Sequence, residues 1–533
     1  MDKVISLSKI TQSLIANFKL IKAKAKPEDS SKLSVSQTVS FFAIVYERIR
    51  NAIEYRDEHL IRRAAIERIL KRRLLLNFQG NGEAENLLRE MLWARYFPEG
   101  SLGSADTGKV QNLIDKYVRV RNELTVGQVS DKKAYYSQFL FDILTCEIEE
   151  ILDPKEAKKT SLFTFFLYQV LKNRFKIEKV PDDEKDAFLY VGVERAYAKS
   201  DNAYLRYHLF TLSHRPLLEM TNEEVGHLMS KMPTTFSKID RMIKSPYSER
   251  LTKYIRQQMP SFLILFELIT RNATDPQKIL TNKDTLWQQV DLICREKYQQ
   301  TSGRLRILGV RSLIYIFLTK MIFAIILEYP LSLYLFNEIN WFSIGVNSLF
   351  PPFLMLLFIL FVRVPGEENT KLIYENIVDI IDSDMSFEND VAHVIRAPRV
   401  KRPMMIFAFT IFYSLTFIIT FTLIYEILTL INFNYISITI FVFFVSVVSF
   451  FAYRVSQVAK EYKLPKKESF FSPFVDFFFM PILSSGKFFS SEISRLNFFI
   501  FIFDFLIEAP FKLIFEVVEE WIAFVKARKE EII

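Results

Sequence analysis

The chain has 533 residues and a formal net charge of +8; 50% of its residues are hydrophobic and 24% are charged. These averages hide an uneven distribution, because most of the 52 Phe residues lie after Ile307 while the charged residues concentrate before it. This distribution excludes a single soluble globule and a disordered chain. With only Cys146 and Cys294, the chain also has no disulfide framework. The predicted fold class is all-α, with a helical cytoplasmic domain, a polytopic membrane domain and an amphipathic C-terminal segment.

Residues 1–303 are predicted to form the cytoplasmic all-helical domain. Apolar residues recur there at i, i+3 and i+4, and no alternating run bounded by hairpin turns indicates β-strands. One long helix is predicted over residues 41–76, with favourable i,i+4 pairs at Glu58–Arg62 and Glu67–Lys71. Acidic residues alternate with basic ones along this helix, which is typical of a solvated face and argues against nucleic acid as a partner.

Two partial ligand-binding motifs occur, and each lacks residues that its ligand requires. Residues 103–109 match the GxxxxGK part of a phosphate-binding loop, but no strand precedes them and a valine follows the lysine. We therefore expect them to cap a helix over residues 109–123. Residues 382–390 have the alternating acids of a calcium-binding loop, but Phe387 and His393 stand where Gly and Glu are needed. The sequence thus predicts no metal and no cofactor.

Catalytic motifs are also missing from the sequence. The five histidines form no HExxH motif, and GxSxG does not occur. The apolar stretches described next contain neither Asp nor His, which excludes nearly every intramembrane hydrolase. The sequence therefore predicts no catalytic residue and leans against an enzyme.

Four stretches are apolar over the roughly 20 residues that a helix needs to cross a bilayer core of ~30 Å. They cover residues 312–336, 341–362, 404–431 and 435–453. Very short connections join the first two and the last two, so each pair must be antiparallel. The sequence therefore predicts two transmembrane hairpins, in residues 304–363 and 403–454.

The distribution of Lys and Arg predicts the orientation of these hairpins. Basic residues flank both hairpins and fill the segment between them, whereas the two turns contain none. Because basic residues stay on the cytoplasmic side, we expect both termini to be cytoplasmic. Residues 364–402 are expected to be a cytoplasmic linker with one amphipathic helix over residues 370–381. The predicted location is the cell membrane, with several passes and no cleavable signal peptide.

Residues 455–533 are predicted to form a Phe-rich, amphipathic interfacial region with a charged tail. Within it, residues 496–515 are long enough to cross the membrane. A crossing would bury Asp504 and Glu508 at a cost of about 2.5–3.5 kcal/mol each. An interfacial helix would leave both carboxylates in water, so the sequence favours that placement and leaves a fifth crossing open.

Polar side chains inside the predicted spans are the candidate site residues. They are Lys320, Glu328, Asn347 and Glu426. Pro330 and Pro351 remove backbone donors close to Glu328 and Asn347, and polar groups beside broken helices form binding sites in transporters. The same side chains can also hold the helices together; the sequence favours this structural role and leaves a functional one open.

The preferred function is a membrane-anchored helical scaffold that binds a protein partner or further copies of itself. The net positive charge and the membrane tether make the anionic inner leaflet of the bilayer a second expected partner. An oligomeric small transporter or channel that uses the intramembrane Glu, Lys and Asn side chains is the alternative. An enzyme acting on lipids at the inner interface is a weaker third hypothesis, because no motif supports it.

Overall fold

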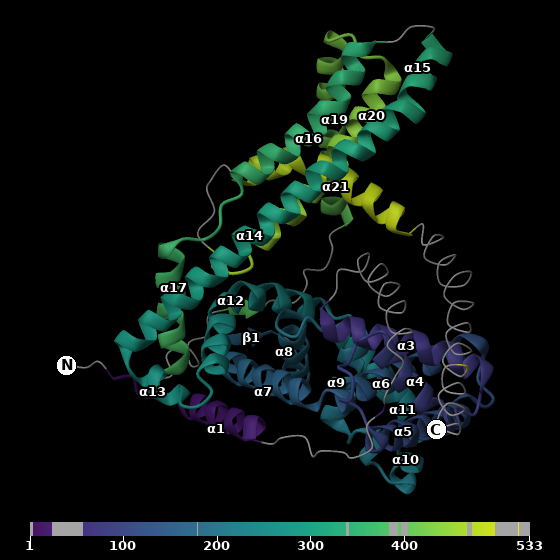
Figure 1. Cartoon of the computed structure of the whole chain (residues 1–533), viewed down its shortest axis with the longest axis vertical. Helices are drawn as coiled ribbons and strands as arrows, with labels where there is room; N and C mark the ends of the chain where they lie inside the picture. Colours follow the sequence, from purple (N-terminus) through teal and green to yellow (C-terminus); the bar gives the residue numbers. More distant parts are fainter. Residues whose placement is uncertain are drawn as a thin grey trace, which may run out of the picture.

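The computed structural model describes residues 4–23, 57–178, 180–336, 340–382, 393–395, 403–465 and 472–495, together with Leu33 and Trp521. These residues form a helical domain, at the bottom of Figure 1, and a set of long apolar helices above it. The fold is all-α, since the described residues include just two strands, of three residues each.

The helical domain consists mostly of α-helices of 11–26 residues, with shorter helical turns between them. Its helices are α1 (Lys9–Ala23), α3 (Glu58–Leu76), α4 (Glu83–Trp93), α5 (Ser104–Thr125), α6 (Ser130–Leu152), α7 (Pro154–Leu171), η1 (Lys172–Arg174), α8 (Asp182–Ala196), α9 (Asn202–Ser213), η2 (Leu217–Glu219), α10 (Asn222–Met229), α11 (Met232–Ile243), α12 (Pro246–Arg271) and α13 (Pro276–Thr281).

The remaining helices are α14 (Lys283–Phe323), the π-helical turn η3 (Ala324–Glu328), α15 (Tyr329–Phe336), α16 (Trp341–Phe361), α17 (Glu367–Ile381), α19 (Pro403–Leu430), α20 (Tyr435–Ala459) and α21 (Ser472–Arg495). Of these helices, α14 begins in the helical domain and continues into the apolar part, α17 packs against the helical domain, and the others belong to the apolar part.

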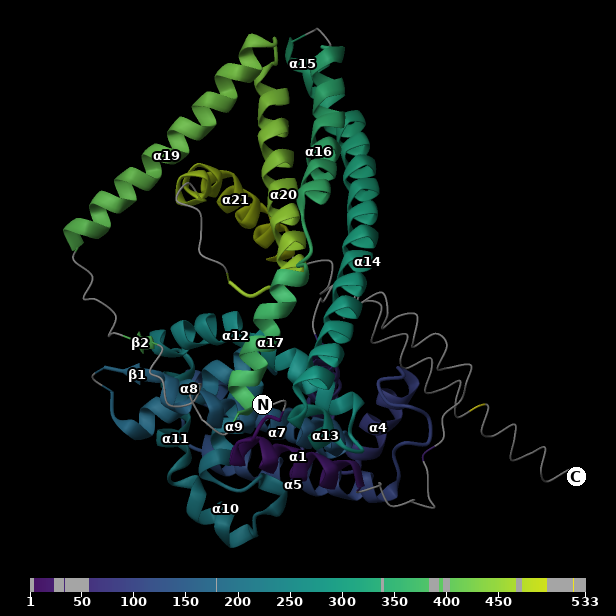
Figure 2. The same cartoon turned by 90° about the vertical axis from the view of Figure 1, so that its left-hand side faces the viewer.

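Four helical segments are long and apolar enough to cross a membrane. They are Lys283–Leu335, Trp341–Phe361, Pro403–Leu430 and Tyr435–Ala459. Their apolar parts coincide with the four predicted apolar stretches. The first is the upper part of one continuous helix that starts in the helical domain at Lys283, so the two parts of the molecule share a helix without a break (Figure 2).

The GxxxxGK segment is the start of a helix and not a phosphate-binding loop. Helix α5 begins at Ser104, directly after Gly103, so the predicted start at Lys109 is wrong. The carboxylate of Asp106 accepts a hydrogen bond of 3.1 Å from the Gly103 N–H and thereby satisfies a free donor at the helix start. Gly108 then lies inside the helix, where its backbone cannot cradle a phosphate.

Helix α3 begins at Glu58, because Asp57 is extended, with ψ 153°. The prediction of one unbroken helix over residues 41–76 is therefore wrong at Asp57; residues 41–56 lie outside the described residues. Both predicted i,i+4 ion pairs of α3 are confirmed, with N–O distances of 3.3 Å for Arg62–Glu58 and 2.7 Å for Lys71–Glu67. The alternation of charge on α3 is thus that of a salt-bridged helix surface.

The two short strands connect distant parts of the chain. Strand β1 (Phe175–Ile177) pairs in parallel with β2 (His393–Ile395), which comes from the predicted linker. The periodicity predicts no strand here, since three residues show no clear alternation and the partner is remote in the sequence. Of the calcium-loop motif, residues 383–390 lie outside the described part of the chain.

Helix α17, in the predicted linker, packs into the core of the helical domain. It contributes four buried isoleucines: Ile373, Ile377, Ile380 and Ile381. These side chains lie against α12 and α14. Leu464, which follows α20, is buried in the same core. The chain therefore returns to the helical domain after α16 and again after α20.

Helix α21 crosses α20 and contacts α19, whereas α19 splays away from α20 (Figure 2). Gly486 lies at the crossing, where a Cβ atom would collide with the carbonyl group of Ser446 in α20. Only glycine allows the two backbones to approach so closely. Tyr413 of α19 and Ser484 of α21 share a hydrogen bond of 2.9 Å. Helix α21 thus contacts both α19 and α20 and connects them.

If α17 is part of the core, removing one of its buried side chains must destabilise the helical domain. Replacing Ile377, which has no exposed surface, by Ala should lower the free energy of unfolding by about 2–5 kcal/mol. Leu372→Ala on the same helix is the matched control, because Leu372 is 37% exposed and its loss should change stability by less than about 0.5 kcal/mol. Thermal unfolding of the full chain in mild detergent measures both; equal effects would contradict the packing of α17.

Candidate functional site

The apolar helices contain a buried ion pair that depends on a π-helical turn. Lys320 and Glu328 are eight residues apart, so a regular α-helix would place them about 80° apart around its axis. Residues Ala324–Glu328 form a π turn, closed by a hydrogen bond from the Tyr329 N–H to the Ala324 carbonyl. Pro330 follows at once and cannot donate to the regular ladder. The wider turn brings Glu328 onto the face of Lys320.

The ammonium group of Lys320 lies 3.0 Å from the Glu328 carboxylate, and neither side chain has any exposed surface. The same ammonium lies 4.7 Å from the centre of the Phe444 ring in α20, a favourable cation–π distance. Lys320 therefore points into the packed helices, and its long side chain does not extend to a water-exposed surface. A buried charge is tolerated because its partner is also buried and in contact.

The second carboxylate oxygen of Glu328 connects two more helices. It accepts hydrogen bonds from the Asn347 amide of α16 and from the Ser437 hydroxyl of α20, at 2.5 and 3.0 Å. The Asn347 amide also donates to the Ser437 carbonyl oxygen, at 3.0 Å. Lys320, Glu328, Asn347 and Ser437 thus form one fully buried group, which we call the polar cluster.

The ends of the same helices are tied together by asparagines. Asn340 and Asn434 cap α16 and α20, each accepting a hydrogen bond from the N–H of the serine three residues later. The Asn340 amide also donates to the Asn432 carbonyl at 2.7 Å, and Asn434 contacts the Ser332 hydroxyl of α15 at 3.4 Å. The polar cluster and these caps fix α15, α16 and α20 to one another.

Three of the four predicted site residues meet in the polar cluster: Lys320, Glu328 and Asn347. Glu426 does not; it is exposed on α19, which packs on α21 and lies outside the cluster. Sequence reasoning missed Ser437, because a serine in an apolar helix carries no charge and is common there. Its position three residues after the cap Asn434 is a signal for the helix start but not for the contact with Glu328.

The charges and the side-chain donors of the polar cluster are all paired within the cluster. The ion pair neutralises both charges, and the Asn347 amide group donates its hydrogen bonds to Glu328 and Ser437. The Asn347 Oδ1 atom is the one group of the cluster with no hydrogen-bond partner. The arrangement therefore presents no free charge to a passing ion, and its clear physical effect is to join three helices.

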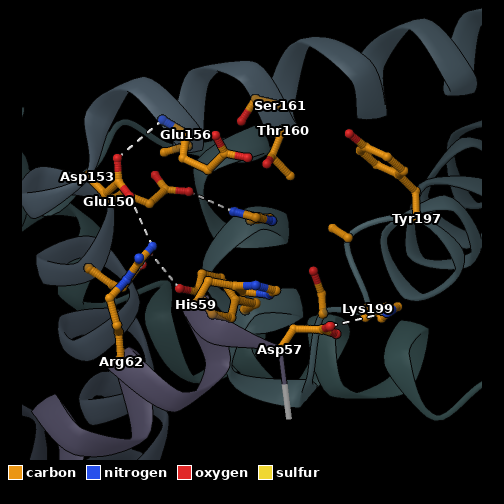
Figure 3. A pocket seen from close by; sticks show the side chains of 16 residues that line it. Asp57, His59, Arg62, Glu150, Asp153, Glu156, Thr160, Ser161, Tyr197 and Lys199 are labelled. Atoms are coloured by element: carbon orange, nitrogen blue, oxygen red, sulfur yellow. Dashed lines mark hydrogen bonds and ion pairs between the residues drawn. The ribbon is translucent and has the colours of Figure 1, made fainter. Parts of the chain in front are cut away.

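A second polar site lies in the helical domain, at a cavity of about 250 Å³ between α3, α6, α7 and α9 (Figure 3). Two glutamates at the end of α6 face it. Glu149 accepts hydrogen bonds from Arg62 and from Tyr204, at 2.8 and 2.9 Å. Glu150 accepts one from Tyr207 and contacts the Nε2 atom of His208, at 3.0 and 2.9 Å.

His208 is held between two carboxylates, Glu150 and Glu194. Its Nδ1 atom lies 3.1 Å from Glu194. Burial alone would lower the pKa of His208, but the two carboxylates hold it well above the usual value and thereby favour the charged imidazole. Burial would raise the pKa of Glu194, yet His208 keeps it below the usual value. Each partner therefore favours the ionised form of the other.

The charged groups that line this cavity are thus largely paired with one another. Arg62 joins Glu149 to Asp153 of the α6–α7 corner, at 2.7 and 3.0 Å, and Lys199 contacts Asp57 at 3.1 Å. Sequence reasoning missed this network, because its members are far apart in the chain and form no motif. Among the residues that the structure describes, no three His, Cys, Asp or Glu side chains are placed to hold a metal ion.

Comparison of the chain with protein-family models, with curated proteins and with solved structures finds no match.

Removing one member of the ion pair should cost far more than removing both. Lys320→Met leaves the Glu328 carboxylate buried without a counter-ion, and should lower the unfolding free energy by about 3–5 kcal/mol. The double variant Lys320→Met/Glu328→Leu removes both charges and should recover most of that loss.

Thermal unfolding in lipid bicelles measures these differences, and Glu426→Gln is the matched control because Glu426 is exposed. Its stability should equal that of the wild type. If the double variant were as unstable as the sum of the two single variants, the two side chains would not be coupled.

Proposed function

We propose that this chain is a multi-pass protein of the cell membrane, whose helical domain acts in the cytoplasm as a scaffold for partner proteins or further copies of the chain. The observation that carries the proposal is the burial of α17 and Leu464 in the core of the helical domain. Both segments follow an apolar helix that leads back from the far end of the bundle. The chain therefore enters and leaves each pair of apolar helices on the same side, the side of the helical domain.

Two transmembrane hairpins agree best with the return of the chain to the helical domain after α16 and again after α20. Helix α14 with α15 leads away from the helical domain, and α16 leads back beside it; α19 leads away and α20 leads back (Figure 2). Exposed arginines occur where α14 leaves the helical domain, at Arg304, Arg306 and Arg311. Since basic residues stay on the cytoplasmic side, the helical domain and both termini face the cytoplasm in this proposal.

The inner leaflet of the membrane is the proposed lipid partner. The exposed arginines of α14 stand at the level where anionic head groups would lie, and such contacts contribute about 1 kcal/mol per basic residue. Helix α21 crosses α20 at Ser446, about halfway along α20 (Figure 2), so its proposed interfacial position rests on the prolines and charges of residues 455–533 and not on this crossing. The residues 496–515 are proposed to follow it along the interface.

The alternative of an oligomeric transporter finds less support. A conduction path needs polar groups that water or an ion can reach. Lys320, Glu328 and Asn347 have no exposed surface, and the first two neutralise each other. The bundle is also joined rigidly to the helical domain by the continuous helix α14. Anchoring and presenting that domain is therefore the simpler role for the four helices.

The mass of the particle extracted from cells tests the scaffold proposal. In lipid nanodiscs formed directly from the membrane, native mass spectrometry should find assemblies heavier than one 62.8 kDa chain, containing further copies or a stoichiometric partner. Liposomes that contain the purified protein should show no cation flux at any membrane potential. A lone 62.8 kDa chain together with flux that Glu328→Gln reduces would contradict the scaffold and support the transporter.

A further inference from the structure

Five large apolar side chains stand exposed at one end of the helical domain. They are Leu75, Leu76, Phe78, Val126 and Val129, and each is at least 67% exposed. The first three follow one another at the end of α3 and in the loop after it. The two valines flank the turn between α5 and α6. We call these five side chains the apolar patch.

Two contacts show that the two halves of the apolar patch lie side by side. Arg121 of α5 donates a hydrogen bond of 3.4 Å to the carbonyl oxygen of Phe78, which ties the loop after α3 to the end of α5. Helices α3 and α6 run antiparallel, because Arg62 contacts Glu149 and Glu67 contacts Gln138. Eight or nine residues beyond the second contact, α3 reaches Leu76 while α6 reaches its first residue, beside Val129.

Basic side chains border the apolar patch. Lys132 and Lys133 are exposed in the first turn of α6, three and four residues after Val129, and one exposed carboxylate, Asp131, lies in the same turn. Neither has an acidic partner among the described residues. The Arg121 guanidinium donates to the neutral Phe78 carbonyl and Asn122 amide oxygens and lies over the Tyr117 ring, with no carboxylate among these contacts. With two lysines and Arg121 against Asp131, the patch is apolar in its centre and carries a net positive charge at its rim, as many protein interfaces do.

We propose that the apolar patch is the docking surface for an amphipathic helix of a partner protein, with an apolar face flanked by acidic residues. The proposal rests on the scaffold function and names its binding surface. Apolar side chains of such a helix would cover the leucines and Phe78, while its carboxylates would meet the basic rim.

The position of the patch favours a protein over the bilayer as its occupant. In both views, α5 and the apolar helices lie at opposite ends of the molecule (Figures 1 and 2). A surface at this end of the helical domain lies far from the apolar helices and does not reach the head groups of the membrane that they are proposed to cross. The occupant must therefore come from the cytoplasm.

A pair of synthetic peptides tests this proposal on the full chain in nanodiscs, with empty nanodiscs as the blank. Both are amphipathic helices of about 18 residues with the same Leu and Phe face. One carries Glu on its flanks and the other carries Lys. Fluorescence anisotropy should show that the Glu peptide binds at least about tenfold more tightly than the Lys peptide at low salt.

Leu76→Ser should weaken binding of the Glu peptide by about tenfold or more, because that side chain is 84% exposed and would be covered by the helix. Lys132→Ala/Lys133→Ala should reduce the difference between the two peptides. Leu212→Ser is the matched control; Leu212 is a leucine of similar exposure, 62%, on α9, and its replacement should leave binding unchanged.

Four outcomes would overturn the proposal. The two peptides could bind equally well, or Leu76→Ser could leave binding unchanged. Deletion of residues 496–533 could also raise peptide affinity, which would make that segment the natural occupant. A dimer that Leu76→Ser dissolves would likewise replace the partner by a second copy. If assemblies heavier than one chain persist while the peptides fail to bind, the patch proposal fails and the scaffold proposal stands.

Discussion

The side chain of Asn369 joins three segments of the chain that are far apart in the sequence. Its amide nitrogen donates to the Tyr298 hydroxyl of α14 and to the Tyr462 carbonyl, both at 2.8 Å. Its oxygen accepts a hydrogen bond of 2.9 Å from the Leu464 N–H. All three contacts lie where apolar helices meet the helical domain, and Asn369 itself is buried. A buried amide with satisfied donors and acceptor fixes the relative positions of these segments.

The polar cluster has the same role at the other end of the apolar helices. Glu328 holds Lys320 of its own helix, Asn347 of α16 and Ser437 of α20. Between these two polar anchors, α14, α16 and α20 are packed along their length. Helix α19 contacts neither anchor, which explains why it alone splays away and depends on α21. The apolar part is therefore a three-helix unit with one laterally attached helix.

The amino-acid sequence predicted the parts of this fold that depend on local pattern. Long apolar runs mark the four apolar helices, and the i,i+4 charge pairs of α3 form as expected. Contacts between distant residues could not be predicted in this way. The burial of Ile377 in the helical domain and the pairing of β1 with β2 both depend on where the chain returns after crossing the bundle.

The candidate site was partly predictable for the same reason. Charged residues in apolar helices are conspicuous, so Lys320 and Glu328 could be selected. Their pairing could not be predicted, because a spacing of eight residues becomes favourable only through the π turn before Pro330. Glu426 has the same signal in the sequence but is exposed on the splayed helix α19, outside the polar cluster.

The central claim is that the helical domain and α17 lie on the same side of the membrane, opposite the turn between α19 and α20. Single cysteines introduced by Lys159→Cys, Lys371→Cys and Tyr435→Cys test it directly, with a membrane-impermeant maleimide added to intact cells. The native Cys146 and Cys294 are buried and give little background. The account expects labelling of Tyr435→Cys in intact cells, and of the other two variants only after permeabilisation. Labelling of Lys371→Cys but not Lys159→Cys in intact cells would contradict it.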